Sequence, residues 1–200
     1  VDLLILETFS NPEEVLVAIR SVAGLGDLPI LAQMTVNENS ETVYGERIDH
    51  AIARIAKEQA VAAVGLNCSV GPSGMLAGLE LIRGVTDKPI AIQPNAGMPR
   101  RIEGRQLYMC TPEYMAEYAK RFYEKGARII GGCCGTTPEH IREIVRAVRS
   151  ISKAASRPDG VISVQVRETG KPSPRAPEPL AARSRFGAKL AAGEPVNSIE

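Results

Sequence analysis

The chain has 200 residues, with 24 Lys and Arg against 23 Asp and Glu, so its net charge at pH 7 is +1. This near-neutral balance gives no electrostatic basis for binding nucleic acid or an acidic membrane surface. No apolar run approaches the roughly 18 residues of a membrane-spanning helix. The 4 cysteines are too sparse for a disulfide scaffold. We therefore expect a cytoplasmic protein that uses thiols for chemistry.

Five short apolar runs, each bounded by turn residues, predict buried β-strands. They cover residues 1–9, 29–36, 62–70, 89–95 and 128–134. Amphipathic stretches separate or follow them, and three of these open with a capping side chain and a proline, at Ser10-Asn11-Pro12, Thr111-Pro112 and Thr137-Pro138. Gly126 is a candidate for the glycine that ends a helix at 114–124.

This alternation predicts an α/β fold built from five βα units. Parallel strands joined by such crossovers form either an open sheet or a closed barrel. A complete (β/α)8 barrel takes about 250 residues. Five units ending near residue 152 would therefore be an incomplete barrel.

The composition changes from residue 153 onward. No apolar period persists, and one stretch contains four closely spaced prolines, Pro172, Pro174, Pro177 and Pro179. This pattern is typical of an extended linker or a disordered tail.

Polar and reactive residues end most of the predicted strands. Glu7 ends the first strand, Asn67 and Cys68 the third, Asn95 the fourth, and Cys133-Cys134 the fifth. Active sites of parallel α/β folds lie at this edge, whether the sheet is open or closed.

Three thiols at one edge suggest a metal, because zinc favours thiolate ligands and catalytic zinc sites keep three protein ligands with an open fourth position. Glycines at 131, 132 and 135 would let both Cys133 and Cys134 turn toward one ion. Two other interpretations of the GGCCGTT segment are possible. It could bind a phosphate through its backbone N–H groups, or one of its cysteines could be a low-pKa nucleophile. Either alternative leaves Cys68 unexplained.

The remaining cysteine and the two histidines are not expected to belong to the functional site. Cys110 lies away from the predicted strand ends and is interpreted as a spare thiol. His50 and His140 lie in predicted helices among charged neighbours, and we expect both on solvated helix faces.

Three motifs resemble a known family. GLNCS at 65–69, PNAGMP at 94–99 and GGCCGTTPEHI at 131–141 are similar to the zinc-dependent homocysteine S-methyltransferases, as is LETFSNPEE at 6–14. The resemblance covers residues 1–151. It implies that this stretch forms strands 4–8 of a (β/α)8 barrel, followed by a linker.

The resemblance also implies roles for site residues. Cys68, Cys133 and Cys134 would bind Zn2+, and Glu7 would bind the ammonium group of homocysteine. Asn95 would lie close to the metal and fill its open position when substrate is absent. Asn67 would support the ligands.

A second, shorter resemblance lies at 185–200, where RFGAKLAAGEPVNSIE is similar to the start of a methylenetetrahydrofolate reductase domain. It implies three parts, a barrel piece at 1–152, a linker at 153–184 and a reductase start at 185–200. The parent would be the bifunctional type, with three βα units upstream and a reductase that binds FAD downstream. The isolated piece is expected to be unstable and inactive, because an open barrel edge exposes apolar surface.

The expected reaction is zinc-dependent methyl transfer to homocysteine, giving methionine. The sequence leaves the donor open among methyltetrahydrofolate, a methyl-corrinoid, betaine and S-methylmethionine. The alternative is a structural zinc or phosphate-binding α/β module without methyltransferase activity.

Overall fold

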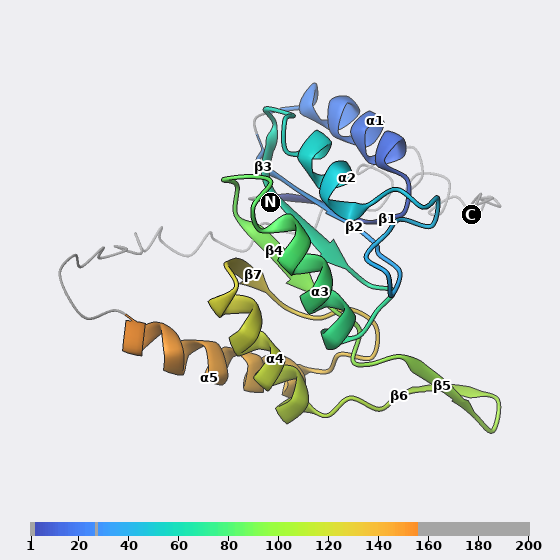
Figure 1. Cartoon of the computed structure of the whole chain (residues 1–200), viewed down its shortest axis with the longest axis vertical. Helices are drawn as coiled ribbons and strands as arrows, with labels where there is room; N and C mark the ends of the chain where they lie inside the picture. Colours follow the sequence, from blue (N-terminus) through green and yellow to red (C-terminus); the bar gives the residue numbers. More distant parts are fainter. Residues whose placement is uncertain (1–2, 27, 156–200) are drawn as a thin grey trace, which may run out of the picture. The chain divides into compact units, whose positions relative to one another are not determined.

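The computed structural model describes residues 3–26 and 28–155 (Figure 1). They belong to one compact unit, Val1–Arg157. Five parallel strands form one sheet in the order β1-β2-β3-β4-β7. Their bounds are Leu4–Phe9 for β1, Ile30–Met34 for β2, Val61–Asn67 for β3, Ile90–Gln93 for β4 and Ala127–Ile130 for β7.

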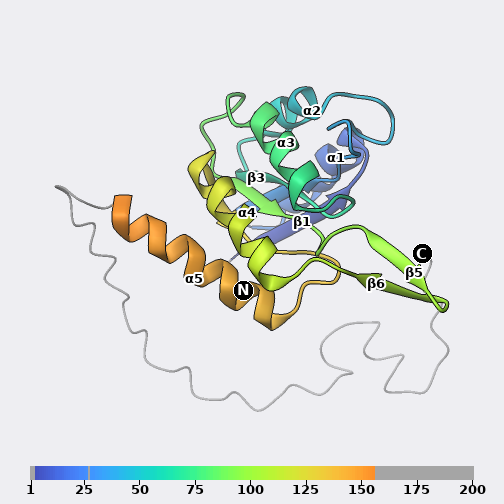
Figure 2. The same cartoon turned by 60° about the horizontal axis from the view of Figure 1, so that its bottom comes forward.

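Five helices connect or follow these strands, which confirms five parallel βα units. They are α1 (Pro12–Ala23), α2 (Ile48–Ile55), α3 (Pro72–Ile82), α4 (Pro112–Glu124) and α5 (Pro138–Ala155). Figures 1 and 2 show neighbouring helices side by side along one side of the sheet, with α4 against α5. An α/β fold with a parallel sheet is therefore established for this part of the chain.

Helices α1, α4 and α5 begin where the sequence predicts their starts. Asn11 caps α1 by accepting a hydrogen bond from the Glu13 N–H, and Thr111 caps α4 by accepting one from the Tyr114 N–H. Gly126 follows α4 with a φ of 105°, which confirms its predicted role at the end of that helix.

The core lies between the helices and the sheet. Ile19 of α1, Ile52 of α2 and Leu79 of α3 are fully buried against Ile30 and Leu66 of the sheet. Burying each such side chain contributes about 1.5–3 kcal/mol relative to exposure. This packing fixes where the strands end, and hence where the site residues lie.

The prediction that the strands are buried on both faces of the sheet is confirmed only for the inner strands. All five residues of β2 are buried, whereas the edge strands β1 and β7 leave Ile5 51% and Ile129 38% exposed. The expectation that all five strands are fully buried was therefore wrong for the two edges, because an edge strand lacks one neighbour.

The sequence analysis missed an antiparallel hairpin. Strands β5 (Pro99–Ile102) and β6 (Arg105–Tyr108) pair with each other and extend away from the sheet (Figure 1).

Helix α5 continues three residues past the predicted boundary at 152. The rest of the predicted linker at 153–184 and the predicted reductase start at 185–200 lie outside the described residues, so the domain boundaries stay a prediction.

Candidate metal centre

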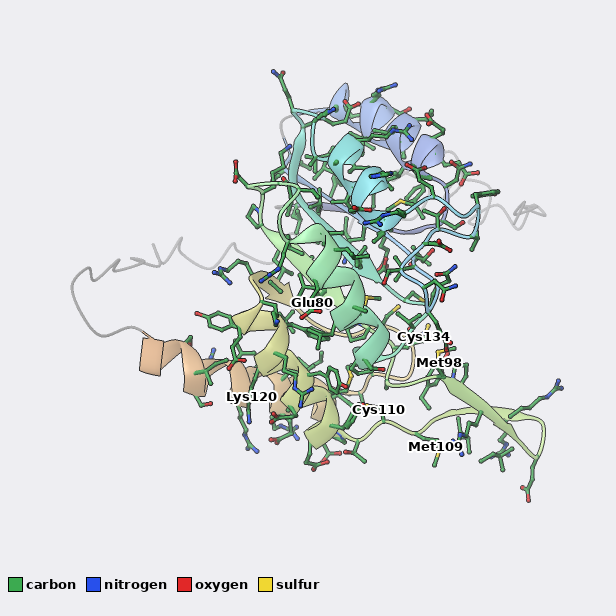
Figure 3. All side chains as sticks on the ribbon, in the orientation of Figure 1. Glu80, Met98, Met109, Cys110, Lys120 and Cys134 are labelled. Atoms are coloured by element: carbon green, nitrogen blue, oxygen red, sulfur yellow. The ribbon has the colours of Figure 1, made fainter. Side chains whose placement is uncertain are left out.

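Three cysteine thiols converge at the carboxyl ends of the strands. Cys68 follows β3, and Cys133 and Cys134 lie in the loop after β7. Their Sγ atoms all lie within 4.8 Å of one another. Cys68 Sγ is 3.6 Å from Cys134 Sγ, which is 3.9 Å from Cys133 Sγ. In the view of Figure 3, Cys134 and Met98 are labelled on the side of the molecule from which the segment 99–108 extends.

These distances fit a tetrahedral zinc ion. Zinc–thiolate bonds of about 2.3 Å in a tetrahedron place neighbouring sulfur atoms about 3.8 Å apart. The two measured separations, 3.6 and 3.9 Å, bracket that value. Cys134 is exposed while the other two are half-buried, so the cluster is open to solvent on one side.

The backbone at Cys68 adopts an uncommon conformation. Cys68 and Ser69 have φ values of 61° and 64°, in the left-handed region that residues other than glycine rarely occupy. The Cys68 N–H donates to the Gln93 carbonyl, 3.1 Å away, and thereby anchors the turn to β4. Such strained residues persist where the surroundings determine them, and they cluster at functional sites.

The glycine-rich loop holds the adjacent cysteines by two different means. Gly135 has a φ of 77°, which provides the sharp turn. Gly132 allows the Thr136 side chain to pack against the backbone, since an added Cβ at 132 would lie 2.3 Å from Thr136 Oγ1. The expectation that conformational freedom explains all three glycines was wrong, because neither Gly131 nor Gly132 has a positive φ.

The same loop is poorly suited to cradle a phosphate. Its N–H groups mostly have internal acceptors: Cys133 N–H donates to Pro94 O at 2.8 Å, and Cys134 N–H to Asn95 Oδ1 at 3.1 Å. The N–H groups of Gly131, Thr136 and Thr137 are also paired. A phosphate cradle needs free N–H groups, so the phosphate reading is not favoured.

The thiols differ in protonation because their surroundings differ. Burial, and secondarily the neighbouring Cys68, raises the pKa of Cys133 to about 12. A hydrogen bond with Cys68 lowers the pKa of Cys134, and further hydrogen bonds with Cys133 and Tyr108 act in the same direction. Cys134 is therefore the cysteine of this pair that gives up its proton more readily.

Glu7 and Asn67 meet beside the cysteines, as the predicted strand ends suggest. Asn67 Nδ2 lies 3.1 Å from Glu7 Oε2 and 4.0 Å from Cys133 Sγ. The register of β1 against β2 shifts between Leu6 and Phe9, so the irregularity falls on the segment that contains Glu7 and Thr8. Bulges of this kind redirect side chains near active sites.

Asn95 is buried, and its side-chain oxygen already accepts the Cys134 N–H. In this arrangement Asn95 holds the backbone of Cys134, and its own role as a metal ligand stays a prediction. The sequence analysis did not identify Thr8, which bonds Asn67, or Tyr108, which contacts the loop. No motif marks either residue.

The two histidines differ. His50 is exposed, as expected. His140 is only 7% exposed, so the expectation of a solvated face was wrong. Its Nδ1 lies 2.8 Å from Thr137 Oγ1 and its Nε2 lies 2.9 Å from the Cys110 carbonyl oxygen. His140 thus ties the start of α5 to the segment after the hairpin. Cys110 lies outside the cysteine cluster, as predicted.

No helix among residues 3–26 and 28–155 combines the length and the apolar character needed to cross a lipid bilayer.

Comparison with curated proteins finds methionine synthases. The chain is 35% identical over 127 residues to the methionine synthase of Mycobacterium tuberculosis, covering 63% of this chain and 11% of that protein. It is also 35% identical over 122 residues to the methionine synthase of Mycobacterium leprae, covering 60% and 10%. The chain thus spans about a tenth of the length of these relatives.

Among solved structures, the apo form of the Escherichia coli homocysteine methyltransferase MmuM matches with a TM-score of 0.60 and 25% identity, over 73% of this chain and 49% of that one. A metallated form of MmuM matches with a TM-score of 0.58 and 26% identity, over 72% and 44%. A sequence model of the family "Homocysteine S-methyltransferase" matches residues 1–148. The chain therefore belongs to the homocysteine S-methyltransferase family.

Proposed function

We propose that the protein transfers a methyl group to the thiol of homocysteine, giving methionine, at a zinc ion held by Cys68, Cys133 and Cys134. The observation that carries this proposal is that the three sulfur atoms lie within 4.8 Å of one another, with two of the separations at 3.6 and 3.9 Å, as expected for three thiolate ligands of a tetrahedral zinc ion. Family membership supplies the substrate, and the likeness to a metallated MmuM supports the metal.

Zinc, when bound, would coordinate the homocysteine sulfur and keep it as a thiolate, whereas a free thiol has a pKa of about 8.5. The sulfur attacks the donor's methyl group, a new S–CH3 bond forms, and the bond between the methyl and the donor breaks. The thiol proton passes to solvent. Methionine is a neutral thioether and a poor ligand, so it leaves.

The chain's own residues position the substrate. Glu7 is exposed beside the cysteines, and its carboxylate would bind the ammonium group of homocysteine. Asn67 holds that carboxylate by donating to Oε2. Asn95 fixes Cys134 from the other side through the Cys134 N–H. Because Cys134 is exposed, the donor can approach from the solvent side.

We further propose that the five βα units are strands 4–8 of a (β/α)8 barrel and that the parent is the bifunctional type, with an FAD-binding methylenetetrahydrofolate reductase downstream. The coverage of 49% of the MmuM chain supports the first part, and the sequence resemblance at 185–200 is the basis of the second. The reading frame on both sides of this chain tests both. A frame without an upstream half-barrel or a downstream reductase would contradict them.

The function is tested on the full-length protein with a Cys68→Ser variant and Cys110→Ser as its matched control. Zinc content and methionine formation are measured with methyltetrahydrofolate, a methyl-corrinoid, betaine and S-methylmethionine in turn. We expect Cys68→Ser to lose zinc and activity while its circular dichroism is kept, and Cys110→Ser to retain both. A protein that binds no zinc, or a Cys68→Ser variant that keeps full activity, would contradict the proposal. Unfolding of Cys68→Ser alone would indicate a structural metal site instead.

A further inference from the structure

The loops that follow β4 and β7 are joined by hydrogen bonds at the metal centre. The Ala96 N–H donates to the Cys134 carbonyl at 2.8 Å, and the Cys133 N–H donates to the Pro94 carbonyl, also at 2.8 Å. The Asn95 side chain adds a third bond, because its Oδ1 accepts the Cys134 N–H at 3.1 Å. The position of Cys134 therefore depends on where the loop after β4 lies.

The loop after β4 is held in turn from its other side. The Cys110 N–H donates to the Ala96 carbonyl at 3.0 Å, and the Cys110 carbonyl oxygen lies 2.9 Å from His140 Nε2. Ala96 is fully buried and His140 is only 7% exposed, so water competes little for these bonds. The contacts form a closed ring, which runs from Cys134 along the chain to His140 and returns through Cys110 and Ala96.

Both nitrogens of the His140 ring are used, and their neighbours determine which one carries the proton. The Thr137 N–H donates to Nδ1 at 3.2 Å, so Nδ1 is an acceptor. The Cys110 carbonyl can only accept, so Nε2 carries the hydrogen that it donates. One nitrogen thus binds the start of α5, and the other binds the segment that leads to the metal centre.

We propose that His140 is a positioning residue of the metal site: its bond to the Cys110 carbonyl keeps Cys134 in the arrangement that binds zinc. The inference rests on the zinc-dependent function proposed above. Cys134 is the exposed member of the cluster, so contacts of its own side chain do little to fix its position. When the arrangement that binds a ligand is populated only in part, the apparent affinity falls by that fraction.

The test separates the two bonds of His140 in the full-length protein. In His140→Gln, the longer amide can donate to the Cys110 carbonyl in place of Nε2 but does not replace the acceptor for Thr137. In His140→Asn, the shorter amide can accept from Thr137 in place of Nδ1 but does not reach Cys110. His140→Ala removes both bonds, and His50→Gln, at an exposed position, is the control.

Two measurements are made on each protein. Zinc affinity is determined by competition with a chromophoric chelator. Amide hydrogen exchange of the metal-free proteins is followed by mass spectrometry in the peptide that contains Ala96, whose N–H donates to Cys134.

We expect zinc binding about ten-fold weaker in His140→Asn and His140→Ala, with faster exchange in the Ala96 peptide, because the bond to Cys110 is lost. His140→Gln should bind zinc within about three-fold of the wild type, and His50→Gln should match the wild type in both measurements.

The Gln and Asn variants distinguish positioning from stability alone. Each keeps one of the two His140 bonds, so a contribution to stability alone would weaken zinc binding equally in both, and that result would overturn the inference. Unchanged zinc affinity in His140→Asn would overturn it as well. If His140→Ala does not fold, the comparison of His140→Gln with His140→Asn decides on its own.

The two proposals fail differently. A wild-type protein that binds no zinc contradicts the proposed function, and the inference falls with it. A wild-type protein that binds zinc and makes methionine, beside His140→Gln and His140→Asn variants of equal zinc affinity, contradicts the role of His140 alone.

Discussion

Asn67 and Thr8 are joined by two hydrogen bonds that run in opposite directions. The Thr8 N–H donates to Asn67 Oδ1 at 2.8 Å, and Asn67 Nδ2 donates to Thr8 Oγ1, also at 2.8 Å. Thr8 lies in the left-handed region, with a φ of 64°. The amide thus holds a strained position within β1 against the end of β3, and its second donor orients Glu7.

Asn67→Asp should damage substrate binding more than metal binding. The carboxylate keeps the acceptor for Thr8 N–H but loses the donor, and it places a second negative charge about 3 Å from Glu7. We expect unfolding to become easier by about 1–3 kcal/mol and the KM for homocysteine to rise at least several-fold, with zinc content unchanged. Urea denaturation and steady-state kinetics measure these effects. Asn39→Asp, an exposed substitution, is the control, and equal KM values in the two variants would contradict the role of Asn67.

Gly65→Ala should be strongly destabilising. Gly65 pairs with Ala91 across β3 and β4, and an added Cβ would lie 2.3 Å from the Ala91 carbonyl oxygen. Backbone atoms of two buried strands cannot move apart cheaply, so we expect a loss of about 3 kcal/mol or more. Gly84→Ala, where an added Cβ meets nothing within 4 Å, should change stability by no more than about 0.5 kcal/mol. Thermal melts that coincide for the two variants would refute this account.

His140→Ala should destabilise the protein while His50→Ala does not. The buried His140 ring bridges Thr137 and the Cys110 carbonyl. Removing the ring takes away one hydrogen-bond partner from each of these groups. We expect a loss of about 1–3 kcal/mol by chemical denaturation. His50 is exposed, and its variant should stay within about 0.5 kcal/mol of the wild type. Loss of stability in both variants to the same extent would show that the bridge is not the cause.

Glu113→Gln should remove an acid-sensitive contribution to stability. Hydrogen bonding to its own backbone N–H, and then to Thr111, lowers the pKa of Glu113 from its usual value of 4.5. A carboxyl group with a lowered pKa stabilises the fold above that usual value, and the contribution disappears as the pH falls through the lowered pKa. The melting temperature of the wild type should therefore exceed that of Glu113→Gln at neutral pH and converge with it in acid.

Thr111→Ala provides a companion for that measurement. It removes one of the groups that bond Glu113, and it also removes the cap that accepts the Tyr114 N–H. Its melting temperature should be lower at every pH, with a smaller pH dependence than the wild type. A difference between wild type and Glu113→Gln that persists unchanged at pH 3 would contradict the assigned cause.

The sheet and the convergence of the cysteines could be predicted from the sequence because both follow from burial. Apolar runs such as that of β2 are visible as patterns, and parallel strands bring their carboxyl ends to one edge. Cys68 and Cys133 could thus be placed together although they lie far apart in the chain. The irregularity of β1 between Leu6 and Phe9 could not be predicted, because the Thr8–Asn67 bonds found there join residues 59 positions apart.

The hairpin and His140 were missed for a related reason. The hairpin strands carry Arg100, Arg101 and Arg105, and their described side chains other than that of Tyr108 are exposed, so no hydrophobic alternation marks them. Charged neighbours surround His140 in the sequence, but in the helix it lies four residues before the buried Ile144 and faces the same side. Its burial depends on the Cys110 carbonyl, which no local pattern reveals.

The packing of Tyr108 on Gly135 links two positions that must change together. Any side chain at 135 would collide with the ring, so an aromatic residue at 108 requires glycine at 135. The left-handed backbone of Gly135 independently resists substitution, which makes position 108 the freer of the two. Related chains that lack the aromatic residue should therefore retain the glycine, whereas chains that lack the glycine should lack the aromatic residue as well.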